Sequence, residues 1–298
     1  MDERPSWARD GHDWPNRASS DFVSAGGLSW HVQRMGQGPQ LLLLHGTGAA
    51  THSWRDLAPL LARDFTLVAP DMPGHGFTSS LPFERMSLPG MAAAVGALVR
   101  ELEIAPDLVL GHSAGAAILI RACLEGLIAP RGIVSLNGAL MPWRGLPGHF
   151  FSPAAKLLAT SPLTSRFFAW RARDRRKIER LVDSTGSTLD PLGVDLYHRL
   201  IRFPSHVSAA LSMMANWDLT LIERALPGLR TPLFLVVGER DTTVSPREAR
   251  RVQQLLPSAQ LVELPGLGHL AHEERPAQVA TVLSDIARGL GLVPGSGI

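Results

Sequence analysis

The chain has 298 residues, and 45% of them are hydrophobic, which is enough to bury one large core. The formal net charge is only +2, which argues against non-specific binding of nucleic acid by the whole surface. Cys123 is the single cysteine, so an intramolecular disulfide is excluded and a reducing compartment is favoured.

Targeting and membrane signals are absent from the sequence pattern. The amino-terminal residues lack the apolar segment of a secretory signal. No apolar run approaches the length of about 18 residues that a membrane span needs. We therefore expect a protein that is soluble or that touches a membrane only at its surface.

The first predicted elements lead up to a buried strand. Residues 1–20 are expected to form a polar extension that carries two tryptophans. Residues 28–34 alternate between apolar and polar side chains, as the edge strand of a sheet does. Residues 41–44 are four leucines, typical of a strand buried on both faces. The sequence HGTG ends this run, and a helix is expected after it with Ser53 as its cap.

Strands and helices then alternate along the chain. Residues 65–69, 108–110 and 133–136 are short apolar runs that predict buried strands. The segments 88–103 and 114–125 have the composition and spacing of helices. Such an alternation with short connections predicts an α/β fold, in which helices cover both faces of a mainly parallel central sheet.

The alternation breaks after the third of these strands. Residues 139–215 contain several prolines and two helical stretches, 165–182 and 195–203, but no clean strand, so we expect a helical cap. Four regular elements follow: a strand at 233–237, a helix at 246–256, a strand at 260–264 and a helix at 276–290. The predicted division is an extension at 1–20, a core at 21–138 and 216–291, and a cap at 139–215.

The sequence GHSAG joins the strand at 108–110 to the next helix. Ser113 would lie where the chain turns sharply from strand to helix, and Gly111 and Gly115 would allow close backbone approach because they have no Cβ atom. The amino end of the helix would favour negative charge near Ser113. The pattern predicts a nucleophile elbow, with a tight turn around a buried serine as the alternative.

Two further polar residues directly follow core strands. Asp241 comes after the strand at 233–237, and His269 comes after the strand at 260–264. Because the carboxyl ends of parallel strands meet at one edge, we expect Ser113, Asp241 and His269 to lie together there. His269 would take the Ser113 proton as general base, and Asp241 would fix the imidazole tautomer.

Acyl transfer also needs donors for a developing oxyanion. The backbone N–H groups of Thr47, in the HGTG loop, and of Ala114, directly after the nucleophile, are the candidates. His45 and Gly46 would shape the loop that carries Thr47.

One alternative for the base and one for the acid remain open. His272 could replace His269 as the base, and Glu239 could replace Asp241. Asn137 follows another core strand, where this arrangement can also place its acid. An amide cannot ionise, and this favours Asp241.

The remaining histidines give no sign of a metal site. His112, beside Ser113, is expected to point away from the nucleophile, so that it packs or lines the pocket. His75 lies between two glycines and is expected to stabilise its loop. No cluster has zinc-site spacing and no glycine-rich loop suits a phosphate, so the sequence predicts neither metal nor cofactor.

The predicted cap combines apolar bulk with positive charge. The segment 166–180 has seven basic and two acidic residues, a net charge of +5. Such a surface suits a flat, apolar ligand with carboxylates. A solvated helix face, or one that rests on anionic lipid, is the alternative. The candidate apolar lining consists of Trp143, Phe150, Phe151, Phe167, Phe168, Trp170, Met213, Met214 and Trp217.

These motifs resemble those of the α/β-hydrolase superfamily over about residues 21–291. HGTG, PDMPGHG, GHSAG, GERD and GLGHLAHEE occur in the order typical of that superfamily. DWPNR, VSLNGAL and MMANWDL are similar to the family of magnesium-chelatase accessory proteins of bacteriochlorophyll biosynthesis, and DWPNR and MMANWDL lie outside the catalytic motifs. That resemblance implies a place near magnesium insertion into protoporphyrin IX and association with magnesium chelatase, but it supplies no reaction.

The sequence as a whole therefore predicts a serine hydrolase that acts on an ester of a bulky apolar molecule, such as a tetrapyrrole. One alternative is a porphyrin-binding or chelatase-assisting protein that does not need catalysis, and another is a carboxylesterase of unrelated metabolism. Dehalogenase chemistry is disfavoured, since its nucleophile is an aspartate. The expected location is the cytoplasm, with peripheral contact to the photosynthetic membrane as an open alternative.

Overall fold

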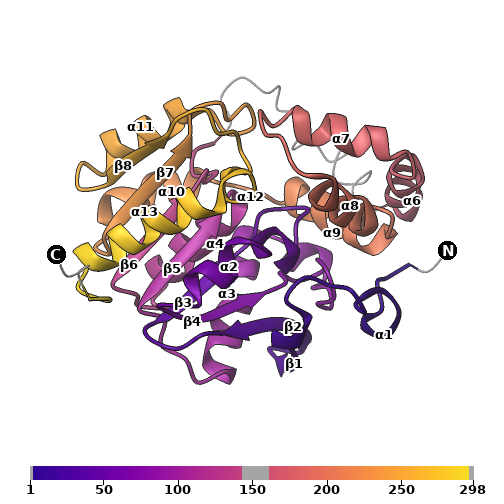
Figure 1. The fold of residues 1–298 in the computed structure, drawn as a ribbon, viewed down its shortest axis with the longest axis horizontal. Coiled ribbons are helices and arrows are strands. Elements are labelled where there is room, and N and C mark those ends of the chain that lie inside the picture. The colour runs from indigo at the N-terminus through magenta and orange to yellow at the C-terminus, as the bar shows by residue number, and fades with distance from the viewer. Residues whose placement is uncertain (1–2, 143–160, 295–298) are drawn as a thin grey trace.

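The computed structural model describes residues 3–142 and 161–294, which fold around an eight-stranded sheet (Figure 1). The strands lie in the order β1-β2-β4-β3-β5-β6-β7-β8. All pairs from β4 to β8 are parallel, whereas β2 is antiparallel to both of its neighbours. The predicted α/β fold with a mainly parallel sheet is confirmed. The strands are β1 (Ser20–Ala25), β2 (Leu28–Met35), β3 (Gln40–Leu44), β4 (Thr66–Pro70), β5 (Leu108–His112), β6 (Gly132–Leu136), β7 (Leu233–Gly238) and β8 (Gln260–Leu264).

Helices cover both faces of this sheet (Figure 1). Successive leucines of β3 show why: Leu42 and Leu44 pack with one set of helices, and Leu41 and Leu43 pack with the other. The first set contains α3 (Leu88–Glu101), α4 (Ala114–Leu124), α10 (Thr220–Ala225) and α11 (Pro246–Leu255), and the second contains α2 (Leu57–Leu61) and α13 (Pro276–Gly289).

Three local predictions are wrong. The strand at 28–34 is not an edge strand, because β1 pairs along its outer side. Ser53 does not cap α2; it is buried in the 3-10 turn Thr51–Trp54 that precedes that helix. The helix expected at 165–182 is two helices, because Asp174 accepts a hydrogen bond from the Arg176 N–H and thereby begins a new helix.

Between β6 and β7, the described residues form helices. These are α6 (Pro162–Arg171), α7 (Arg175–Asp183), α8 (Pro191–Ile201), α9 (Pro204–Ala215) and then α10. Figure 1 shows α6 to α9 grouped beside one end of the sheet. Within residues 3–142 and 161–294, no helix has the length and apolar character needed to cross a membrane. Trp143, Phe150 and Phe151 of the predicted lining lie outside the described residues.

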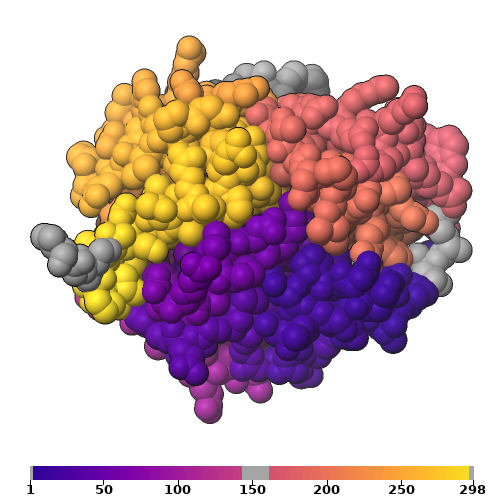
Figure 2. Space-filling view, in the orientation of Figure 1, coloured from indigo at the N-terminus to yellow at the C-terminus, as the bar shows by residue number. Residues whose placement is uncertain are grey.

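The amino-terminal extension packs against both core and cap, as Figure 2 shows on one face of the molecule. It contains α1 (Trp7–Asp10) and a 3-10 turn at Arg17–Ser19. The buried Trp14 donates its indole N–H to Thr51 Oγ1 at 3.0 Å. Arg199 of α8 forms an ion pair of 2.7 Å with Asp13. The extension is thus joined by specific contacts to the core and to cap helix α8.

A buried charged cluster connects the cap to the core. Arg55, which precedes α2, forms an ion pair with Glu273 of α12 (Ala271–Glu274). Tyr197 of the cap helix α8 donates its hydroxyl to the same carboxylate at 2.7 Å. Burial raises the pKa of Glu273 to about 7, although the Arg55 charge acts in the opposite direction. The Arg55 and Glu273 side chains are 4% and 0% exposed, so neither has water to replace a lost partner.

Replacing Arg55 by methionine should lower the free energy of unfolding by about 3–5 kcal/mol, because Glu273 is left buried without its cation. The double replacement Arg55→Met with Glu273→Leu should recover most of that loss. Urea unfolding followed by circular dichroism measures both effects. A single variant as stable as the double variant would show that this ion pair does not join cap and core.

Candidate active site

The backbone at Ser113 has the strained conformation that an elbow requires. Ser113 lies between β5 and α4 with φ 51° and ψ −117°, a region that costs a non-glycine residue about 1–3 kcal/mol. A Cβ atom on Gly111 would lie 2.3 Å from the Ala116 nitrogen, and one on Gly115 would lie 2.2 Å from the Leu44 carbonyl oxygen. Both positions of the GHSAG motif therefore require glycine, and the Ser113 side chain remains partly exposed.

Asp241 and His269 meet at the ends of β7 and β8, as their positions in the sequence predict. The His269 Nδ1 atom lies 2.7 Å from Asp241 Oδ2. The other carboxylate oxygen accepts from the N–H groups of Thr243 and Val244, at 2.8 and 2.9 Å. Because a carboxylate only accepts, Nδ1 carries the proton and Nε2 is left free to accept one.

Asn137 supplies a further contact that the sequence did not predict. Its side-chain N–H donates to Asp241 Oδ2 at 2.7 Å, so this oxygen accepts from both Asn137 and His269. Asn137 has a φ of 47°, which asparagine tolerates better than most residues. Asn137, which follows β6, therefore orients the carboxylate of Asp241, which follows the neighbouring strand β7.

His112 joins the elbow to the loop that carries His269. Its Nε2 atom lies 2.9 Å from the His269 carbonyl oxygen, and the two rings are 4.7 Å apart. His112 is thus buried in this contact, and its predicted part in lining the pocket stays a prediction. Within the described residues, no hydrogen bond joins the Ser113 hydroxyl directly to His269. Such contacts are often long in the absence of substrate and shorten in the reacting complex.

The HGTG loop lies directly beside the nucleophile. A Cβ atom on Gly46 would be 3.1 Å from Ser113 Cβ. In the part of the chain that the structure describes, neither the Thr47 N–H nor the Ala114 N–H has a hydrogen-bond acceptor. Both candidate oxyanion donors are therefore unengaged, which is what a site for a transient anion requires.

Hydrogen bonds from two neutral histidines hold the HGTG loop in place. The Met72 N–H donates to His45 Nε2 at 2.8 Å, so His45 Nδ1 carries the proton and donates to the Gly46 carbonyl at 2.8 Å. His206 of α9 likewise accepts from the Gly76 N–H and faces the Gly48 carbonyl at 3.0 Å. Burial lowers the pKa of both imidazoles, that of His206 to about 4. Protonation would replace each acceptor nitrogen by an N–H and break the contact.

A loop of the cap also supports His269, and no local pattern predicts this. The His269 N–H donates to the Thr185 carbonyl at 3.2 Å, and the Leu270 N–H donates to Ser187 Oγ at 2.8 Å. A Cβ atom on Gly268 would lie 2.3 Å from the Gly186 backbone, so the two loops are in close contact. The loop after α7 thereby holds the candidate base from the cap side.

The alternative acid and base have other contacts. His272 is fully buried between the rings of Trp54 and His112, and burial lowers its pKa to about 3. Neither of its ring nitrogens has a partner among the described residues. Glu239 accepts a hydrogen bond from the Gly266 N–H at 3.0 Å. These surroundings favour His269 as the proposed base and Asp241 as the proposed acid. In the described parts of the chain, no three His, Cys, Asp or Glu residues are grouped to hold a metal ion.

The described residues of the predicted apolar lining differ widely in exposure. Phe167, Phe168 and Trp170 of α6 are 50%, 47% and 57% exposed, and Met214 of α9 is 51% exposed. Met213 is fully buried in the core. A role of these residues in substrate binding stays a prediction.

Comparisons with known proteins agree with this architecture. The family model described as the alpha/beta hydrolase family matches residues 41–282. The chain is 36% identical to the Magnesium-chelatase 30 kDa subunit of Rhodobacter capsulatus, covering 93% of this chain and 97% of that protein. It is 28% identical to the pimeloyl-[acyl-carrier protein] methyl ester esterase of Vibrio parahaemolyticus, covering 86% of this chain and 98% of that protein.

A similar solved structure is an alpha/beta hydrolase fold protein from Burkholderia ambifaria. The TM-score is 0.75 at 24% identity, and the match covers 89% of this chain and 97% of that one. The family model and the 36% identical relative each match most of the chain. The family assignment therefore rests on sequence similarity as well as on the fold. The chain belongs to the alpha/beta hydrolase family.

Proposed function

We propose that this protein is a serine hydrolase that cleaves an ester through an acyl-Ser113 intermediate. The observation that carries the proposal is the 2.7 Å contact between His269 and Asp241, on strand ends that lie beside the strained Ser113 elbow. Thr47 of the HGTG loop and Ala114, directly after Ser113, add two N–H groups that have no acceptor among the described residues.

In the proposed reaction, Ser113 Oγ attacks the ester carbonyl carbon while His269 Nε2 takes the hydroxyl proton. The carbonyl oxygen becomes an oxyanion that accepts hydrogen bonds from Thr47 and Ala114. The C–O bond to the alcohol then breaks, and His269 returns the proton to the departing alcohol. Water attacks the acyl group with His269 again as base, which releases the carboxylic acid and restores Ser113. Asp241, oriented by Asn137, stabilises the imidazolium in both steps.

The substrate we propose is an ester of a bulky apolar molecule, and specifically a tetrapyrrole ester. The support is the likeness to a protein named as a magnesium-chelatase subunit, together with the motifs outside the catalytic loops. On this basis the reaction would occur at or near magnesium insertion in bacteriochlorophyll biosynthesis, with magnesium chelatase as the associated enzyme. The location that follows is the cytoplasm or the cytoplasmic surface of the photosynthetic membrane.

A genetic experiment tests this pathway role. In a phototrophic host that lacks the native protein, the Ser113→Ala variant should fail to restore bacteriochlorophyll, whereas the wild-type chain should restore it. Equal protein levels on immunoblots are the control. Pigment restored by Ser113→Ala would contradict a catalytic role and favour a porphyrin-binding or chelatase-assisting function.

The oxyanion hole gives a separate prediction at Thr47. Its proposed donor is the backbone N–H, so Thr47→Ala should change turnover little, whereas Thr47→Pro removes the donor. Loss of one such donor costs about 3–4 kcal/mol of transition-state stabilisation, or roughly 100- to 1,000-fold in kcat. Steady-state kinetics on a p-nitrophenyl ester measures the loss, and circular dichroism verifies the fold. Full activity of a folded Thr47→Pro variant would exclude Thr47 as a donor.

A further inference from the structure

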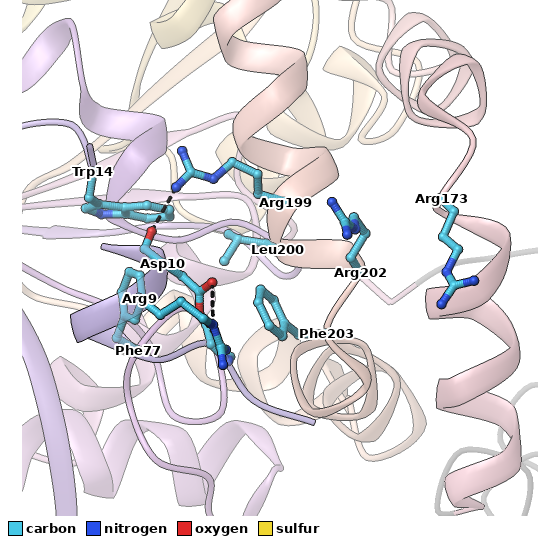
Figure 3. Close-up of a pocket in the computed structure, with 10 residues that line it drawn as sticks. Arg9, Asp10, Trp14, Phe77, Arg173, Arg199, Leu200, Arg202 and Phe203 are labelled. Atoms are coloured by element: carbon cyan, nitrogen blue, oxygen red, sulfur yellow. Dashed lines mark hydrogen bonds and ion pairs between the residues drawn. The ribbon is translucent and has the colours of Figure 1, made fainter. Parts of the chain in front are cut away.

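The amino-terminal extension and the cap enclose a pocket of about 290 Å³, which no proposed catalytic residue lines (Figure 3). Trp14, Phe77 and Phe203 form much of its apolar wall. Four arginines and one aspartate also line it, and they come from the extension, from α8 and from the neighbouring cap segments. The pocket thus combines aromatic surface with an excess of positive charge.

Trp14 of the DWPNR motif lines this pocket. Trp14 is held by its hydrogen bond to Thr51, and the Pro15 carbonyl accepts from the Gln33 side chain at 2.7 Å. Asn16 donates to the Arg55 carbonyl at 3.1 Å. Because consecutive residues of the motif are anchored to the core, the Trp14 part of the aromatic wall is formed before any ligand arrives. These contacts fix the position of Trp14 in the pocket wall.

The charges around the pocket are not equally neutralised. Arg199 pairs with Asp13 and also donates to the Asp10 carbonyl at 2.8 Å. Arg202, at the end of α8, is exposed and has no ion pair or side-chain hydrogen bond within the described chain. It directly precedes Phe203 in the chain, and both residues line the pocket (Figure 3). A ligand carboxylate would give Arg202 the partner that the protein does not supply.

We propose that this pocket binds a small organic carboxylate with an apolar ring or acyl body. The guanidinium of Arg202 would hold the carboxylate through paired hydrogen bonds, and the aromatic side chains would cover the apolar body. Ligand pockets range from about 300 to 1,000 Å³, so this one is at the small end and suits a body the size of naphthalene. An intact tetrapyrrole is too large for it, and the site is independent of the proposed hydrolysis.

Calorimetric titration of the full chain with 2-naphthoate tests the proposal. Saturable binding is expected, and neutral 2-naphthamide and the small anion acetate should each bind at least tenfold more weakly. Arg202→Glu should weaken naphthoate binding about 10- to 100-fold, since charge-assisted hydrogen bonds are lost. Arg63→Glu is the matched control, because Arg63 is also exposed but does not line the pocket; it should leave binding unchanged.

Thermal unfolding of both variants verifies that they are folded, and the exposed position of Arg202 leads us to expect an unchanged midpoint. The proposal is overturned if naphthoate shows no saturable binding, or if its affinity is the same in Arg202→Glu as in the wild type. Equal affinity for naphthoate and naphthamide would also overturn it, because the carboxylate would then contribute nothing.

Discussion

Replacing His269 by alanine should reduce the turnover of a p-nitrophenyl ester by roughly a millionfold, as should Ser113→Ala. The two residues act as a unit in the proposed mechanism, because Ser113 has no other base to take its proton. The double variant should therefore be no worse than either single variant. Steady-state kinetics with burst-phase analysis measures these losses.

His272→Leu is the control that separates the two histidines. Leucine has a volume close to that of histidine and can occupy the space between Trp54 and His112, and His272 has no hydrogen bond to lose among the described residues. This variant should keep turnover within a fewfold of the wild type. Full activity of His269→Ala together with an inactive, folded His272→Leu would show that His272 is the base.

Acidification should unfold the protein cooperatively near pH 5, and this is the second large effect that we expect. Burial lowers the pKa values of six histidines, so the unfolded chain binds more protons below pH 6.5 than the folded chain does. Stability is therefore fully present above that pH and falls as the pH decreases toward the folded pKa values. The six residues are His45, His52, His75, His112, His206 and His272.

The size of this effect follows from the linkage between protonation and folding. A histidine that stays neutral in the folded state costs about 1.4 kcal/mol for each pH unit below 6.5. His206 and His272, with pKa values of about 4 and about 3, would together cost about 5 kcal/mol by pH 4.5. Glu273 acts in the opposite direction, because its pKa is raised to about 7 and it gains a proton in the same range. Burial also raises the pKa of Glu248, so among the described residues two carboxylates offset part of what six histidines lose.

Urea unfolding at pH 7.5, 6.0 and 5.0 measures this dependence. The His272→Leu variant should lose less stability between pH 7.5 and 5.0 than the wild type, since one buried titrating group has been removed. Stability that is constant over this range, or that rises as the pH falls, would show that the buried histidines do not control it.

Much of the fold was predictable because its signals are local. The four leucines of β3 indicate a strand with helices on both sides, and the GHSAG sequence indicates the turn from β5 into α4. The structure confirms both elements. Asp241 and His269 were predicted to meet because each follows a parallel strand, and the structure places them in contact. Their catalytic roles stay predictions that the kinetic experiments address.

The missed features depend on contacts between distant parts of the chain. Asn137 contacts Asp241 across 104 positions, and only the pairing of β6 with β7 brings them together. The contact of Thr185 with His269 likewise needs the folded cap. Trp14 could be recognised as an unusual residue in a polar extension, but its partner Thr51 is 37 positions away. Local periodicity carries no information on such pairs.

Covalent labelling tests the central claim most directly. The wild-type protein should react with a fluorophosphonate to give one adduct by intact mass spectrometry, and peptide mapping should place it on Ser113. Ser113→Ala should show no adduct, and His269→Ala should react far more slowly because the serine has lost its base. An unmodified wild-type protein, or an adduct on a residue other than Ser113, would contradict the account.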